Sequence, residues 1–264
     1  LFARSFPGTR PLARTTPPDP AIPPELPHCP LGALPGLFWP GNADPVAPAA
    51  YLRADPATTD RMRAALAALG PGRKIGIAWR GGHPAAKRPR FIPPEAWRPL
   101  FAQDDTAFVC LQHGPDAAEL AALTAVAGRP VHRLPGCDPL LDMDHFAALV
   151  SALDAVVSVD NSTVHLAGAL GVPTAVLLAV DSDWRWGVDG VPCPWYRSVL
   201  RLRQTAPNNW ANPLCAAAQF ARQPHLADHH RIRPDRHIFQ RRGNGNRRRQ
   251  VCRRLGDAQT RDHI

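Results

Sequence analysis

Apolar runs and helical patterns take turns along the chain from residue 74 onward. The apolar runs are rich in β-branched residues and predict strands over 74–79, 107–112, 131–134, 156–160, 174–179 and 195–203. The stretches between them repeat apolar residues at helical spacing and predict helices over 94–101, 117–127, 143–155 and 162–170. Strands that alternate with helices in this way form parallel βαβ units. The pattern therefore predicts an α/β fold with a Rossmann-like parallel sheet.

The chain on either side of this domain has a different pattern. Residues 1–50 are rich in proline, which breaks helices and central strands, so we expect an extended lead-in left from an N-terminal domain. Residues 51–73 predict a linker helix that Asp55 caps. Residues 205–264 are rich in arginine and show no sustained period, which predicts a disordered tail. We therefore assign residues 74–204 to the α/β domain.

The positive charge of the chain is concentrated in its tail. The formal net charge is +9, and residues 215–264 account for +8 of it with twelve arginines against four aspartates. Clustered arginine is typical of nucleic-acid binding, but the nearly neutral remainder makes this function the weakest of those considered. No apolar stretch approaches the roughly 18 residues of a membrane span, and we expect a cytoplasmic protein. The cysteines form no CxxC pair, so no zinc site is predicted.

The strongest candidate site follows the predicted strand over 156–160. Ligands of an open parallel sheet bind outside the carboxyl ends of its strands. Here the strand ends in Asp160-Asn161-Ser162-Thr163 and a helix begins. Free N–H groups and the helix dipole favour a phosphate at such a helix start, beside the hydroxyls of Ser162 and Thr163. The alternative is an ordinary helix cap with no ligand.

Other candidates lie in the neighbouring loops. Lys87 follows the first strand and is a candidate partner of a diphosphate, or else a solvated charge. His165 lies one turn into the 162–170 helix and either faces the ligand or packs inside the protein. Trp184 and Arg185 follow the fifth strand and either contact a base, sugar or phosphate or cover the edge of the sheet.

Several segments between residues 28 and 204 carry motifs in a recognisable order. They include Ile75-Gly-Ile-Ala-Trp-Arg-Gly-Gly-His83, Leu111-Gln-His-Gly114, Ser158-Val-Asp-Asn-Ser-Thr-Val-His165, Asp183-Trp-Arg-Trp186 and Pro194-Trp-Tyr196. Together they resemble the glycosyltransferase-like C-terminal domain of bacterial tetratricopeptide-repeat proteins. That domain is related to the heptosyltransferases and to the O-linked N-acetylglucosamine transferases.

The resemblance implies a GT-B architecture, in which two Rossmann-like domains face each other across a cleft. This chain would be the C-terminal half, which binds a nucleotide-diphosphate sugar. The implied donor-binding residues are Trp79, Gly81, Lys87, Gln112, Asp160, Ser162, Thr163, His165, Trp184 and Arg185. Such enzymes need no metal or cofactor, because helix N–H groups and cations neutralise the leaving diphosphate. The catalytic base and the acceptor site would belong to the other half.

The chain also departs from the family pattern. The segment after Lys87 is short, and His113 stands where a lysine is common. The expected closing helix is not recognisable past residue 214, and most of the N-terminal domain is missing. Together with the arginine- and proline-rich ends, these departures suggest a truncated gene or a shifted reading frame.

Three functions fit the sequence. The leading one is transfer of a sugar from the nucleotide-diphosphate donor to a protein or glycan acceptor. The second is a non-catalytic module that binds the nucleotide sugar without transferring it. The third is nucleic-acid binding through the arginine-rich tail.

Overall fold

The computed structural model describes residues 1–224 except 13, 24, 26, 28, 39–48, 82–89, 116, 188–192 and 194. Lys87 lies outside the described residues, as does the predicted tail beyond residue 224. Among the helices of the described part, none is long and apolar enough to cross a membrane.

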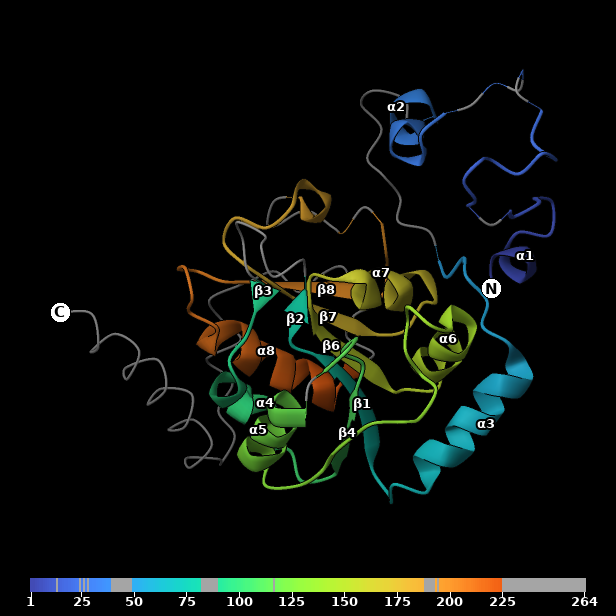
Figure 1. Ribbon diagram of the computed structural model, residues 1–264. Coiled ribbons are helices and arrows are strands. Elements are labelled where there is room, and N and C mark those ends of the chain that lie inside the picture. The colour runs from blue at the N-terminus through green and yellow to red at the C-terminus, as the bar shows by residue number, and fades with distance from the viewer. Residues whose placement is uncertain are drawn as a thin grey trace.

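A six-stranded parallel sheet with the order β5-β4-β1-β6-β7-β8 forms the centre of the fold (Figure 1). Its strands are β1 (Arg73–Ala78), β4 (Thr106–Cys110), β5 (Val131–His132), β6 (Ala155–Val159), β7 (Thr174–Leu178) and β8 (Val199–Arg203). Every pairing in this sheet is parallel, for example Ile75 beside Ala155 and Val156 beside Thr174. The predicted Rossmann-like parallel sheet is confirmed.

Helices cover both faces of the sheet because its strands are apolar on both sides. On one face lie α3 (Pro56–Ala67), α6 (Met143–Ser151) and α7 (Ser162–Ala169) (Figure 1). On the other lie α4 (Arg98–Phe101), α5 (Ala117–Ala127) and α8 (Ala211–Arg222). Side chains of one strand alternate between the two layers, as Phe108 and Val109 of β4 do. Each helix layer thus packs against the sheet through a hydrophobic core.

The structure changes the ends of several predicted elements. The predicted 94–101 helix begins as a 3-10 turn, η2 (Pro94–Trp97), before α4. The predicted 143–155 helix ends at Ser151, because Ala155 already pairs with Ile75 in the sheet. Asp55 caps α3 as predicted, with its side chain accepting a hydrogen bond from the Thr58 amide.

Helix α8 corrects two expectations, the domain end at residue 204 and the lack of a closing helix. It lies inside the range assigned to the disordered tail, yet Leu214, Ala217 and Phe220 are at most 2% exposed. They pack in the same core as Ile77 and Phe101. The sequence pattern was misleading here because the apolar stripe is made mainly of alanine, which is weakly hydrophobic. The folded α/β unit therefore extends to residue 222.

The linker helix and the lead-in contact this unit as well. Leu66 of α3 is 2% exposed and packs in the core under α6, so α3 is part of a helix layer. The lead-in holds α1 (Phe2–Ser5), η1 (Leu31–Ala33) and α2 (Leu34–Phe38). Further on, the amides of Tyr51 and Leu52 both donate to the carbonyl of Ala169, 2.9 Å away, at the end of α7.

Candidate functional site

The candidate site lies between β1 and β6, where the order in which successive strands are added to the sheet reverses. From β1 the chain builds outward through β4 and β5, and from β6 it builds the other way through β7 and β8. The connections after β1 and β6 lead to helices on opposite faces of the sheet. The region at the carboxyl ends of these two strands, here called the crevice, is the position where such sheets bind ligands. Among the described residues, the predicted site residues follow these two strands and their neighbours β4 and β7.

The two loops approach each other closely. Gly81, in the short strand β2 (Arg80–Gly81), lies so near the β6 loop that a Cβ there would stand 2.6 Å from the Asp160 carbonyl oxygen. The side-chain amide of Asn161 also donates to the Arg80 backbone carbonyl at 3.2 Å. Only glycine allows this approach without moving the backbone. Gly81 thus shapes the crevice through its lack of a side chain.

Asn161 caps the helix that begins at the crevice. Its side-chain oxygen accepts hydrogen bonds from the amides of Thr163 at 3.0 Å and Val164 at 3.4 Å. Ser162, the first helical residue, is exposed, whereas Thr163 is 3% exposed. The structure therefore contains the helix cap that the alternative predicts. The contact of Ser162 and Thr163 with a diphosphate stays a prediction. Gly171 follows the helix end with a φ of 74°, as the predicted helix stop requires.

Asp160 is the most buried charged group of the crevice, and its partner is Arg90. The carboxylate of Asp160 is 8% exposed and lies 2.7 Å from the Arg90 guanidinium, which also donates to the Asp160 carbonyl at 2.6 Å. Arg90 belongs to β3 (Arg90–Phe91), which pairs with β2. The sequence did not single out Arg90, because nothing in its spacing points to a partner 70 residues away.

His165 is held inside the crevice by aromatic residues. Its Nδ1 lies 3.0 Å from the Tyr196 hydroxyl, and its ring stacks on Trp186 with centroids 5.1 Å apart. Its Nε2 lies 3.9 Å from Asp160 Oδ1. Burial lowers the pKa of His165, and the Asp160 carboxylate opposes this effect in part. Burial therefore favours the neutral imidazole. Sequence reasoning missed Tyr196 and Trp186 as partners of His165.

Gln112 and Trp79 lie at the carboxyl ends of β4 and β1, next to the crevice. The Gln112 side-chain oxygen accepts hydrogen bonds from the amides of Trp79 at 3.1 Å and Arg80 at 3.0 Å. The Trp79 side chain is 1% exposed and belongs to the hydrophobic core, so its burial does not support the expected role of its ring in lining the pocket. Gln112 fixes the loop after β1.

Trp184 and Arg185 lie at the rim, in the 3-10 turn η3 (Trp184–Trp186). Trp184 is 68% exposed, and the Arg185 guanidinium lies 4.8 Å from the centre of its ring. Arg185 also pairs with Asp183 at 2.8 Å. Trp186 of the same turn is fully buried against His165. Trp186 therefore packs inside the protein while Trp184 faces solvent, and the ligand contact of Trp184 and Arg185 stays a prediction.

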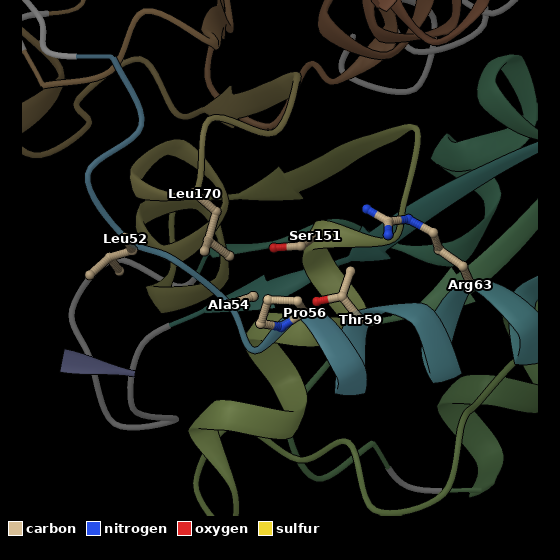
Figure 2. A pocket seen from close by; sticks show the side chains of 7 residues that line it. All are labelled: Leu52, Ala54, Pro56, Thr59, Arg63, Ser151 and Leu170. Atoms are coloured by element: carbon tan, nitrogen blue, oxygen red, sulfur yellow. The ribbon is translucent and has the colours of Figure 1, made fainter. Parts of the chain in front are cut away.

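A separate hollow of about 290 Å³ lies at the opposite end of α7 (Figure 2). Its lining consists of Leu52, Ala54, Pro56, Thr59, Arg63, Ser151 and Leu170. None of the predicted site residues is among them. In the part of the chain that the structure describes, no cluster of three or more His, Cys, Asp or Glu side chains could hold a metal ion.

Comparisons with known proteins identify the family. The family model for glycosyltransferase family 9 (heptosyltransferase) matches residues 59–211, more than half of the 264 residues. Protein FlbA of Caulobacter vibrioides is 37% identical over 151 residues, which span 57% of this chain and 25% of FlbA.

Two solved structures from E. coli also match. The ADP-heptose LPS heptosyltransferase II gives a TM-score of 0.48 at 17% identity, over 66% of this chain and 53% of that chain. Heptosyltransferase WaaC with ADP gives 0.42 at 20% identity, over 58% and 44%. The chain thus spans about half the length of each of these structures and a quarter of FlbA. By the match of the family model, the chain belongs to glycosyltransferase family 9, the heptosyltransferase family.

Proposed function

We propose that this chain is the donor-binding domain of a glycosyltransferase and that it binds a nucleotide-diphosphate sugar in the crevice between β1 and β6. The observation that carries this proposal is the convergence of Arg90, Asp160, His165 and the start of α7 at one point of the sheet. Membership of family 9 supports the donor class.

In this proposal the diphosphate lies at the start of α7. Because Asn161 occupies the amides of Thr163 and Val164, the exposed Ser162 makes the first contact. Thr163 joins it when the Asn161 side chain rotates away. Lys87 and Arg90 supply positive charge beside the phosphates.

The proposed reaction replaces the bond between the sugar's anomeric carbon and the diphosphate by a bond to an acceptor hydroxyl. The diphosphate leaves with the bonding electron pair, and a base removes the proton of the acceptor. The helix start and the cations stabilise the charge that develops on the leaving diphosphate. The proposed chemistry calls for no metal or cofactor. The acceptor is a protein or a glycan.

The rim has a separate role in the proposal. The exposed ring of Trp184 offers a flat apolar surface for the base or sugar of the donor, and Arg185 lies against that ring. The support for this role is the exposure of Trp184 beside a crevice whose other tryptophan, Trp186, is buried.

Calorimetric titration with ADP-, GDP- and UDP-sugars, followed by an assay for the released nucleoside diphosphate, tests the proposal. Binding with turnover is the expected result for a complete transferase. Binding without turnover supports the alternative of a non-catalytic binding module. If none of the nucleotide sugars binds, both functions are wrong.

The role of Lys87 has its own test. Lys87→Ala should weaken binding of a nucleoside diphosphate by about tenfold or more, because a charge-assisted contact contributes about 1.5–3 kcal/mol. Binding of the free nucleoside should stay the same. Arg98→Ala, which removes an exposed cation from α4, is the matched control. Equal weakening of diphosphate and nucleoside would place Lys87 outside the phosphate site.

We further propose that the domain works in the bacterial cytoplasm as part of a tetratricopeptide-repeat protein. The support is the resemblance of its motifs to the domain that such proteins carry. Fractionation of cells that produce the tagged protein tests the location, and a membrane-bound signal would contradict it.

A further inference from the structure

The imidazole of His165 has a fixed orientation in the crevice. Its Nδ1 meets the Tyr196 hydroxyl at 3.0 Å, and Trp186 stacks on the ring with an angle of 16° between the planes. Its Nε2 lies 3.9 Å from Asp160 Oδ1, which is beyond the range of a hydrogen bond. A neutral imidazole carries its proton on one of these two nitrogens, and the partner of Nδ1 together with the charge near Nε2 decides which one.

Tyr196 is built into the fold as that partner. It is 7% exposed, and its ring lies so close to α7 that a Cβ at Gly168 would stand 2.5 Å from it. The Tyr51 ring stacks beside the Tyr196 ring, with the ring centroids 6.5 Å apart. Burial raises the pKa of the Tyr196 phenol, so the hydroxyl keeps its proton at neutral pH.

The Asp160 carboxylate favours one direction of the hydrogen bond between His165 and Tyr196. If Nε2 carried the lone pair, that lone pair would face a negative charge 3.9 Å away, which is unfavourable. If Nε2 carries the proton, the N–H dipole faces the carboxylate favourably. Nδ1 then accepts, so the Tyr196 hydroxyl donates to His165.

We propose that Tyr196 is a positioning residue that holds His165 in the Nε2–H tautomer, so that the histidine offers an N–H donor to the phosphates of the bound nucleotide sugar. The phosphate contact rests on the proposed function. The tautomer itself does not, because every group that sets it belongs to the protein.

The first experiment measures the tautomer without any ligand. Nitrogen-15 NMR of the full chain distinguishes protonated from unprotonated imidazole nitrogens, and the spectrum of His165→Gln assigns the signals of His165. We expect a protonated Nε2 in the natural protein and a mixture of tautomers in Tyr196→Phe, which removes only the hydroxyl. Tyr51→Phe is the matched control and should keep the Nε2–H form, because Tyr196 can still donate. A protonated Nδ1 in the natural protein would overturn the proposal.

The second experiment measures binding of ADP, GDP and UDP. Tyr196→Phe should weaken the nucleotide that binds best by about three- to tenfold, the usual effect of one hydrogen bond. In the His165→Gln background the same change should have no further effect, because the glutamine amide supplies its own N–H donor. Equal weakening in both backgrounds would mean that Tyr196 acts only through packing. If no nucleotide binds the natural protein, the proposed function fails, while the NMR result still decides the tautomer.

Discussion

Asp160 shows how single residues gain their roles from distant partners. It is 6% exposed and would be costly to bury without a counter-charge, which the Arg90 guanidinium provides at 2.7 Å from the carboxylate. Arg90 also donates to the Asp160 backbone carbonyl at 2.6 Å. His165 lies on the other side of the same carboxylate. The chemistry of the crevice therefore depends on one buried carboxylate that links two potential ligand contacts.

The burial of His165 predicts how stability depends on pH. Its pKa is lower in the folded protein than the value of about 6.5 in an unfolded chain, so the unfolded chain binds the proton more readily. The free energy of unfolding should therefore decrease as the pH falls below about 6.5. His165→Gln lacks this proton and should lose less stability between pH 7 and pH 5, as measured by urea denaturation. Equal losses in both proteins would contradict the lowered pKa.

At the scale of elements, the crevice depends on the close approach of β2 to the loop after β6. Gly81→Ala would place a methyl group 2.6 Å from a backbone oxygen, so the two loops must move apart. We expect a destabilisation of about 1–3 kcal/mol together with weaker nucleotide binding. Gly36→Ala is a suitable control, because among the described residues no atom beyond its own helix and chain neighbours lies within 4 Å of a Cβ at that position. Thermal unfolding and calorimetric titration measure the two effects.

Helix α8 permits a test of where the folded unit ends. Phe220 is 2% exposed in the core beneath β6 and β7, so Phe220→Ala should destabilise the protein by about 3–5 kcal/mol. Gln219→Ala changes an exposed neighbour on the same helix and should have almost no effect. Urea denaturation measures both. A small effect of Phe220→Ala would mean that α8 does not belong to the folded unit, as the sequence pattern predicts.

At the scale of the whole molecule, the crevice and the hollow of Figure 2 lie at opposite ends of α7 and are two alternative sites for a ligand. Hydrogen exchange with and without a bound nucleoside diphosphate separates them. We expect protection of the amides at 79–81, 161–165 and 184–187, which surround the crevice. The amides at 52–63, beside the hollow, should exchange as before. Protection confined to 52–63 would move the binding site to the hollow.

The sequence by itself determined the α/β class, the order of strands and helices and the crevice loops, because hydrophobic periodicity is a local property that burial on both faces of a sheet imposes on each segment. The Asp160-Asn-Ser-Thr163 turn could also be placed, since a strand end followed by a helix cap is a local signal. Only the tertiary structure decided the pairing of Arg90 with Asp160 and of Tyr196 with His165. The weak apolar stripe of α8 likewise became a core element only through its packing on the sheet. These contacts join residues tens of positions apart, and they follow from the folding of the sheet, which brings the ends of distant strands together.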